Sequence, residues 1–347
     1  MSAEPLAWRA DRRAAVWAAY ALVLVAAPWV WTGSLALTVL TQIGIGIVAL
    51  LAYNVLLGQG GMLSFGHAVY SGLGGFFAIH TLALVGDGRL PLPVALVPLA
   101  GGLAALAVAA LLGWVTTRKA GTAFAMITLG IGELVWAIAL MAPGFFGGDG
   151  GVSADRVVGP PVLGVSFGPA IEVYYLVAAY CLASTALLYA FTGTPLGRVL
   201  NAVRDNAERV AFIGYRPATV RWAAFMVSGF FMGVAGGLAA LNLEIVGAEM
   251  LGAARSGAYL LFTFVGGAGH FAGPIAGAVL MVLALVLLSG LTQAWLLYMG
   301  LAFVAMVVWA PGGLAGLAAA HARLLAAGGM RRVARPYGAL LGAAVVL

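Results

Sequence analysis

The chain has 347 residues, of which 63% are hydrophobic and 8% are charged. A soluble domain is about half apolar and about a quarter charged, so this composition excludes a soluble globular protein. The formal net charge is +6, and the basic residues lie in short patches between apolar runs. That arrangement is typical of membrane topology and not of a nucleic-acid-binding surface.

Ten apolar segments follow one another along the chain, and each is a candidate membrane helix. A helix needs about 20 apolar residues to cross the hydrocarbon core, and these runs lack the alternating polarity of barrel strands. They predict an all-α polytopic membrane protein with about ten transmembrane or re-entrant helices. The first segment resembles a signal peptide, but its long apolar run indicates an uncleaved anchor helix. The segments are 14–31, 35–57, 67–86, 92–115, 121–142, 171–192, 221–243, 254–267, 272–290 and 293–310.

Positive charge assigns the sides of the membrane. With the N-terminus in the cytoplasm, only Arg89, Arg156 and Arg255 of the 17 Lys and Arg residues fall outside. Because positive residues collect on the cytoplasmic side, both termini are predicted to be cytoplasmic. The same rule favours two short segments over one interrupted helix for residues 254–290, and a re-entrant arrangement of these segments stays open.

The domain organisation follows from these spans. We predict a single transmembrane domain over residues 1–318 and a cytoplasmic C-terminal tail over residues 319–347. The last ten residues of the tail, 338–347, are apolar but too short to span a bilayer.

A glycine-rich break separates the second and third segments. It covers residues 54–67 and carries the polar side chains of Asn54, Gln59, Ser64 and His67. Unwound backbone at membrane depth is tolerated only where it meets protein or water. The break therefore predicts a gate or pathway element, with close packing of its small residues as the alternative. His67 either makes a local hydrogen bond in the turn or shapes the broken helix near the gate.

Two further polar residues belong to the predicted pathway or gate. Charges at bilayer depth are costly and usually functional, and Glu133 lies within the segment 121–142. Glu133 can form a hydrogen bond between helices, act on the substrate or gate, or couple a proton flow. His270 lies in a second glycine-rich turn and has the same two interpretations as His67.

The sequence contains no pattern of an enzyme active site. No group of His, Cys, Asp or Glu has metal-ligand spacing, and no nucleophile–histidine set stands in these apolar runs. The G-x-x-x-x-G-K-[ST] phosphate loop is also missing from the sequence. We predict that the chain is not an enzyme and that it binds no cofactor itself.

Residues 193–221 form the longest predicted cytoplasmic connection. Thr194 is suited to cap the start of a helix, and Gly214 is suited to end it. Between them, apolar residues recur at helical spacing with charged residues on the other faces. This amphipathic helix either lies on lipid headgroups or docks a cytoplasmic partner. Its mixed charge, with Asp205 and Glu208 among arginines, argues against headgroup binding alone.

A glycine-rich external segment covers residues 143–170 and is too long for a bare turn. It predicts either a docking surface for a delivery protein or a mobile loop.

The cytoplasmic stretch 193–214 is similar to a loop of the branched-chain amino acid ABC transporter permeases and is closest to the LivM type. In that family the loop reads G-R, then A-[IV]-R-[ED]-N, then G. The resemblance implies a coupling helix that seats in an ATPase, and this helix also includes Glu208. The matching residues here are Gly197, Arg198, Ala202, Val203, Arg204, Asp205, Asn206 and Gly214.

Five other stretches resemble the same family in the same order, so that the resemblance covers about residues 35–318. The first of them contains the Ser64-Phe-Gly-His67-Ala signature. The stretches are 57–68, 124–133, 146–152, 265–277 and 310–316.

The resemblance implies a multi-pass subunit of a bacterial inner membrane. Its expected partners are a second, homologous permease, two cytoplasmic ATPase subunits that use ATP, and a periplasmic substrate-binding protein. The expected cargo is branched-chain or other hydrophobic amino acids, with urea, short amides or, more distantly, sugars as alternatives. An ion-coupled secondary transporter would need carboxylates in several spans, and a membrane-embedded enzyme would need clustered catalytic residues; the sequence shows neither pattern.

Overall fold

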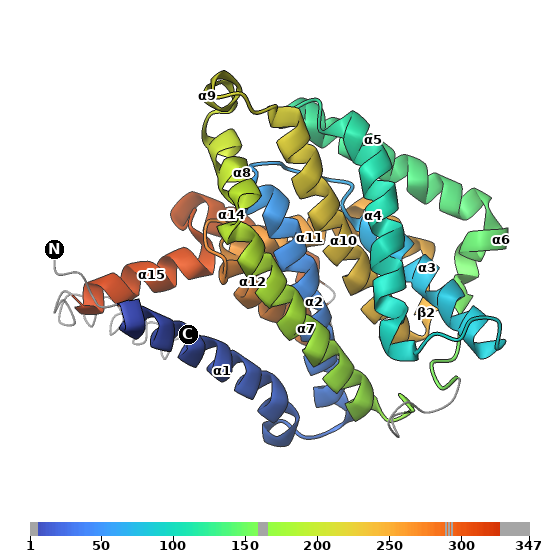
Figure 1. Cartoon of the computed structure of the whole chain (residues 1–347). Helices are drawn as coiled ribbons and strands as arrows, with labels where there is room; N and C mark the ends of the chain where they lie inside the picture. The colour runs from blue at the N-terminus through green and yellow to red at the C-terminus, as the bar shows by residue number, and fades with distance from the viewer. Residues whose placement is uncertain (1–5, 159–165, 289, 291, 293, 327–347) are drawn as a thin grey trace.

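The computed structural model describes residues 6–158, 166–288, 290, 292 and 294–326, and these are mainly helical (Figure 1). The α-helices are α1 (Leu6–Val30), α2 (Ser34–Asn54), α3 (Ala68–Gly86), α4 (Val97–Thr116), α5 (Gly121–Met141), α6 (Pro143–Phe146), α7 (Ala170–Gly193), α8 (Pro195–Asp205), α9 (Ala207–Phe212), α10 (Pro217–Leu243), α11 (Ala253–Gly266), α12 (Gly273–Leu283), α14 (Trp295–Trp309) and α15 (Gly313–Ala326).

Short elements join these helices. The π-helices η1 (Val55–Gln59) and η5 (Ala284–Leu288) extend α2 and α12. The 3-10 turns are η2 (Val94–Leu96), η3 (Gly148–Gly150) and η4 (Ala248–Leu251). The strands β1 (Val152–Ser153) and β2 (Ile245–Val246) form an antiparallel pair in which Val152 lies opposite Val246. The predicted apolar C-terminal end, 338–347, lies outside the described residues.

Six described helical stretches are long and apolar enough to cross a membrane: α2 with η1, α3, η2 with α4, α5, α7 and α10. The bent pair α14 and α15, with 45° between its two parts, adds a seventh if it counts as one span. The apolar parts of α1 and α12 are shorter. The prediction of an all-α polytopic protein is confirmed, whereas the number ten and the cytoplasmic termini stay predictions.

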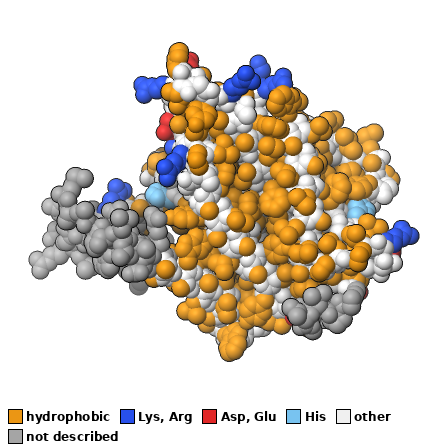
Figure 2. All heavy atoms as spheres, viewed as in Figure 1, with side chains coloured by type: hydrophobic (Ala, Val, Ile, Leu, Met, Phe, Trp, Pro, Cys, Tyr) orange, Lys and Arg blue, Asp and Glu red, His pale blue; other side chains and the backbone are white. Residues whose placement is uncertain are grey.

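The surface of the molecule has the character that lipid requires. Apolar side chains predominate on the face shown in Figure 2, and several Lys and Arg side chains gather at the end where α9 lies. On α4, for example, Leu103, Leu111 and Val115 are all exposed. An apolar surface this continuous is rare on a protein that faces water and is suited to hydrocarbon.

Glycines bring the three central helices into main-chain contact. A Cβ atom built on Gly74 of α3 would lie 2.5 Å from the Cα atom of Gly233 in α10. A Cβ atom on Gly101 of α4 would overlap the Gly74 carbonyl oxygen. Since lipid supplies no hydrophobic force between apolar helices, close packing through small residues stabilises this core.

The cytoplasmic connection differs from the prediction of one helix between Thr194 and Gly214. The predicted cap is confirmed, because Thr194 Oγ1 accepts from the Gly197 amide at 3.2 Å. The helix then breaks at Asn206, whose side chain accepts from the Arg209 amide at 3.0 Å and begins α9. Asparagine favours such caps because its side chain competes for backbone hydrogen bonds. A single amphipathic helix was therefore the wrong prediction, and two short helices replace it.

The described residues 253–288 form two helical segments joined by a turn, as the two-segment interpretation predicted. The turn 267–272 joins α11 to α12, and Gly277 of α12 packs so closely that a Cβ atom there would overlap the Phe262 carbonyl oxygen of α11. A full span needs about 20 residues, and both helices are shorter than that, even when η5 is added to α12.

Candidate functional site

The helix that begins as α2 changes to π geometry in η1 and unwinds before α3. Gly58 lies inside η1, where a Cβ atom would overlap the Ala268 carbonyl oxygen and the Asn54 side chain. Gly61 follows with a φ angle of +62°, in the left-handed region that favours glycine. These glycines let the break pack against the turn between α11 and α12, so the two glycine-rich turns of the sequence meet. Single π turns inside helices are frequent at functional sites.

Side chains from other parts of the fold hold the unwound main chain. The Tyr53 hydroxyl donates to the Ser64 carbonyl oxygen at 2.7 Å. The Ala68 amide donates to Ser256 Oγ of α11 at 2.9 Å. Ser64 Oγ and Asn54 Oδ1 are buried and have no hydrogen-bond partner among the described residues. The break is therefore enclosed by protein, and it retains polar groups that can pair in another arrangement.

His67 joins the start of α3 to two neighbouring helices. Its Nε2 atom lies 2.8 Å from Ser228 Oγ of α10, and Ser228 donates to the Ala52 carbonyl oxygen of α2. Because the serine proton goes to Ala52, the serine oxygen accepts, and the histidine carries its proton on Nε2. His67 is fully buried, and its Nδ1 atom has no hydrogen-bond partner among the described residues. The predicted role in shaping the broken helix thus has a geometric basis, although its part in gating stays a prediction.

The surface helix α8 is bonded directly to the break. Arg204 Nη1 donates to the Gly58 carbonyl oxygen, and Asn201 Nδ2 donates to Gln59 Oε1 at 2.9 Å. Gly61 packs on the stem of Arg204, where a Cβ atom would lie 2.6 Å from Cγ. The two helices are therefore connected through polar bonds and close packing. A displacement of α8 would be transmitted to η1.

The other predicted coupling residues are mostly exposed, although Asp205 forms an ion pair with Arg204 at 3.1 Å. Gly197 is buried, and a Cβ atom there would overlap the Phe191 carbonyl oxygen, so its role in the fold is close packing against the end of α7. Arg198, Ala202, Asp205, Asn206, Glu208 and Gly214 are exposed. This surface is available to a partner, and its role in docking stays a prediction.

Comparison with known proteins identifies the family of the chain. Residues 35–310 match the family model described as "Branched-chain amino acid transport system / permease component". The chain belongs to this family. It is 30% identical to the high-affinity branched-chain amino acid transport system permease protein LivM of Salmonella typhimurium over 322 residues, which cover 85% of this chain and 73% of the relative. The LivM protein of Escherichia coli is also 30% identical, with the same coverage. No solved structure matches the chain.

Membership in the branched-chain amino acid permease family gives the chain its general role. It is a permease subunit of an ABC-type importer that works with other subunits, and its relatives are transport permease components. The family and the apolar helices together make it a multi-pass protein of the inner membrane.

Two predicted pathway residues lie apart from the polar contacts of the break. Glu133 is exposed on α5, although its neighbour Gly132 packs next to Gly66 of the break. His270 is exposed in the turn between α11 and α12, and its main chain closes the turn by donating to the Gly267 carbonyl oxygen at 3.1 Å. Their roles in a pathway or gate stay predictions.

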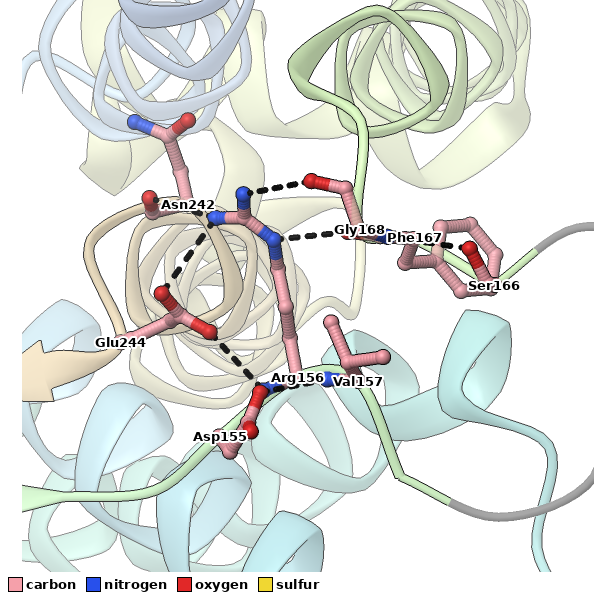
Figure 3. Close-up of polar contacts among 8 residues, drawn as sticks. All are labelled: Asp155, Arg156, Val157, Ser166, Phe167, Gly168, Asn242 and Glu244. Carbon is pink, nitrogen blue, oxygen red and sulfur yellow. Dashed lines mark hydrogen bonds and ion pairs between the residues drawn. The ribbon is translucent and has the colours of Figure 1, made fainter.

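A second arginine cluster holds the opposite end of the permease (Figure 3). Arg156 donates to the carbonyl oxygens of Phe167 (2.7 Å), Gly168 (3.2 Å) and Asn242 (3.3 Å). Its guanidinium also lies 3.7 Å from Glu244, which accepts from the Arg156 amide as well. Together with the β1–β2 pair, this cluster fixes the segment after α6 to the end of α10.

Several of these residues escaped prediction from the sequence. Asn201 carried a usable signal, because it lies one helical turn from both Gly197 and Arg204 and so shares their face of α8. Ser228 and Tyr53 carried none, because each is a small or aromatic residue in a continuous apolar run whose partner lies on another element.

Proposed function

We propose that this chain moves branched-chain or other hydrophobic amino acids from a periplasmic binding protein to the cytoplasm, driven by ATP. Two cytoplasmic ATPase subunits use the ATP, and the chain itself binds no cofactor. A second, homologous permease completes the transmembrane unit. The cargo assignment is supported by the names of the family and of the LivM relatives.

In this proposal the end that carries α8 and α9 is cytoplasmic, and the end that carries β1 and β2 is external. Both termini are cytoplasmic. The permease domain covers residues 1–318 and the tail residues 319–347, a boundary that falls within α15. The distribution of Lys and Arg supports this orientation.

The observation that carries the proposal is the bonding of α8 to the break. A helix seated in an ATPase would follow the movement of that ATPase as a rigid element. Arg204 and Asn201 would then pass the displacement to Gly58 and Gln59, where the α2 helix is already unwound. The exposed side chains of α8 and α9 remain free to contact the ATPase.

Arg204→Gln in the complete transporter, reconstituted in liposomes, tests this transmission. We expect the ATPase subunits to remain bound while leucine uptake per ATP hydrolysed falls about tenfold, since one charge-assisted bond of about 1.4 kcal/mol is lost. Arg198→Gln is the matched control on the same helix, because Arg198 is exposed and does not contact the break.

Arg198→Gln and Glu208→Ala are expected to weaken co-purification of the ATPase and to leave uptake per ATP unchanged. The proposal fails if Arg204→Gln leaves uptake per ATP unchanged. It also fails if Arg204→Gln acts only by releasing the ATPase.

A further inference from the structure

A large cavity lies between the helices and is lined by none of the residues 54–67 of the break. Its volume is about 810 Å³, and α2, α10, α11, α12 and α14 line it. Most of the wall is apolar, including Ile45, Phe262, Met281 and Val282. Cavities of this size and character bind small molecules that are largely apolar.

Four polar side chains line the same cavity, and two of them lie near helix ends. Asn242 stands near the end of α10 and Arg255 near the start of α11, whereas Tyr259 lies in the middle of α11 and Gln42 in the first half of α2. These ends face the side of the molecule that carries β2 and the Arg156 cluster. Asn242 and Arg255 therefore lie toward the proposed external side of the cavity, among apolar lining residues such as Leu243.

Arg255 is the one charged residue among the described residues that line the cavity. It is exposed, and its Nε atom donates to the Tyr259 hydroxyl at 3.2 Å. Glu249 attracts it electrostatically but forms no ion pair with it in the described structure. The two terminal nitrogens of the guanidinium therefore have no carboxylate partner in the described part of the chain. A guanidinium left open in this way matches a carboxylate with two parallel hydrogen bonds.

The cavity lining also contains hydrogen-bond acceptors, the side-chain carboxamides of Gln42 and Asn242. No side-chain hydrogen bond involves Gln42 or Asn242 among the described residues, and Figure 3 shows the Asn242 carboxamide pointing away from Arg156. Carboxamide oxygens accept from an ammonium group. The described residues of the lining include no acidic side chain, so a ligand with a net positive charge would be repelled by Arg255.

We propose that this cavity is a binding site for a zwitterionic amino acid with a hydrophobic side chain. Arg255 binds the carboxylate, the carboxamides of Gln42 and Asn242 bind the ammonium group, and the apolar wall takes the side chain. This inference rests on the proposed function and adds the site to it. The site would also distinguish hydrophobic amino acids from urea, because urea has no carboxylate for Arg255 to bind and no apolar group to contact the wall.

Binding to the purified, complete transporter without ATP tests the site. Labelled leucine is the ligand, and leucinamide, lysine, urea and phenylalanine are the competitors. We expect phenylalanine to compete, and we expect leucinamide, lysine and urea to compete at least about tenfold less well. Arg255→Gln is expected to weaken leucine binding at least tenfold and to abolish the preference for leucine over leucinamide. Arg89→Gln is the control, because Arg89 is an exposed arginine predicted on the same side but outside the cavity.

A second variant keeps the test valid if Arg255→Gln fails to assemble. Ala49→Leu narrows the apolar part of the cavity and leaves Arg255 in place. We expect it to weaken phenylalanine binding more than alanine binding. Equal effects on both amino acids would overturn the assignment of this wall.

Two failures are distinguishable in these experiments. If the wild-type transporter binds leucine through Arg255 but does not import it with ATP, the proposed function falls and the site remains. If it imports leucine while Arg255→Gln and Ala49→Leu bind and import like the wild type, the site is overturned. Co-purified phospholipid that is lost in Arg255→Gln without any change in leucine binding overturns it too, since the cavity is then a lipid site.

Discussion

Arg156 and Arg204 both donate to main-chain carbonyl groups, but they hold the two ends of the permease differently. The Arg156 side chain is 16% exposed, binds three carbonyl oxygens and pairs with Glu244. The Arg204 side chain is 39% exposed, and its main-chain bond is to Gly58 alone. One end of the molecule is therefore fixed by a guanidinium whose three nitrogens all donate to carbonyl groups, whereas the other end is joined to the break by a few bonds that water can replace.

This difference matches what an importer subunit needs from its two ends. The end near β1 and β2 must keep its shape while a delivery protein docks there, according to our proposal. The α8 end must move when an ATPase moves. Many strong hydrogen bonds that fix this end in one position would therefore oppose transport. The number of bonds and their exposure to solvent set the stiffness at each end, and the residue type is the same at both.

The largest effect on stability is expected from Arg156→Ala. This change leaves Glu244 without its ion pair and three carbonyl groups without their donor, which costs about 3 kcal/mol of folding free energy. The apparent unfolding temperature of the purified permease in detergent measures it. Arg89→Ala is the control, since the Arg89 side chain is 74% exposed and its pair with Asp87 is worth little. Equal shifts in the two variants would show that the Arg156 cluster is not a fixed point.

A smaller effect is expected from Ser228→Ala, between the two ends. The variant leaves the buried His67 Nε2 without an acceptor and removes the hydroxyl bond to the Ala52 carbonyl oxygen, and this costs about 2 kcal/mol. The same unfolding measurement applies. Thr38→Ala removes an exposed hydroxyl that bonds within its own helix, and it should leave the unfolding temperature unchanged. A Ser228→Ala protein as stable as the wild type would mean that this buried pair does not hold the break.

The smallest effect is expected from Asn201→Ala. It removes one amide–amide bond between α8 and Gln59 near solvent, so the loss of folding free energy should be about 0.5 kcal/mol. Transport should fall more than stability does, because this bond transmits movement in our proposal. Leucine uptake and unfolding temperature measured on the same preparation compare the two effects. A large loss of stability would contradict the view that the α8 end is lightly held.

The sequence was sufficient to predict those parts of the site that depend on residues close together in the chain. Thr194 was recognised as a cap because the capping residue and the amide it accepts from lie three positions apart. The break at residues 54–67 was recognised because its glycines interrupt an apolar run. The break at Asn206 was missed, because apolar residues recur at helical spacing on both sides of it and hide the change of direction. Asn201 was passed over because its partner Gln59 lies 142 positions away.

Composition and the order of apolar runs determined by themselves that this is a helical membrane protein, because the need to satisfy backbone hydrogen bonds in lipid acts on each segment separately. Only the tertiary structure decided the different surroundings of three arginines. Arg156 donates to three carbonyl groups, Arg204 donates to the break, and Arg255 lines a cavity. Arg156 and Glu244 are 88 positions apart, and His67 and Ser228 are 161 positions apart. Such pairs form when helices pack, and packing depends on the shapes of both surfaces at once, which no local pattern in one segment can express.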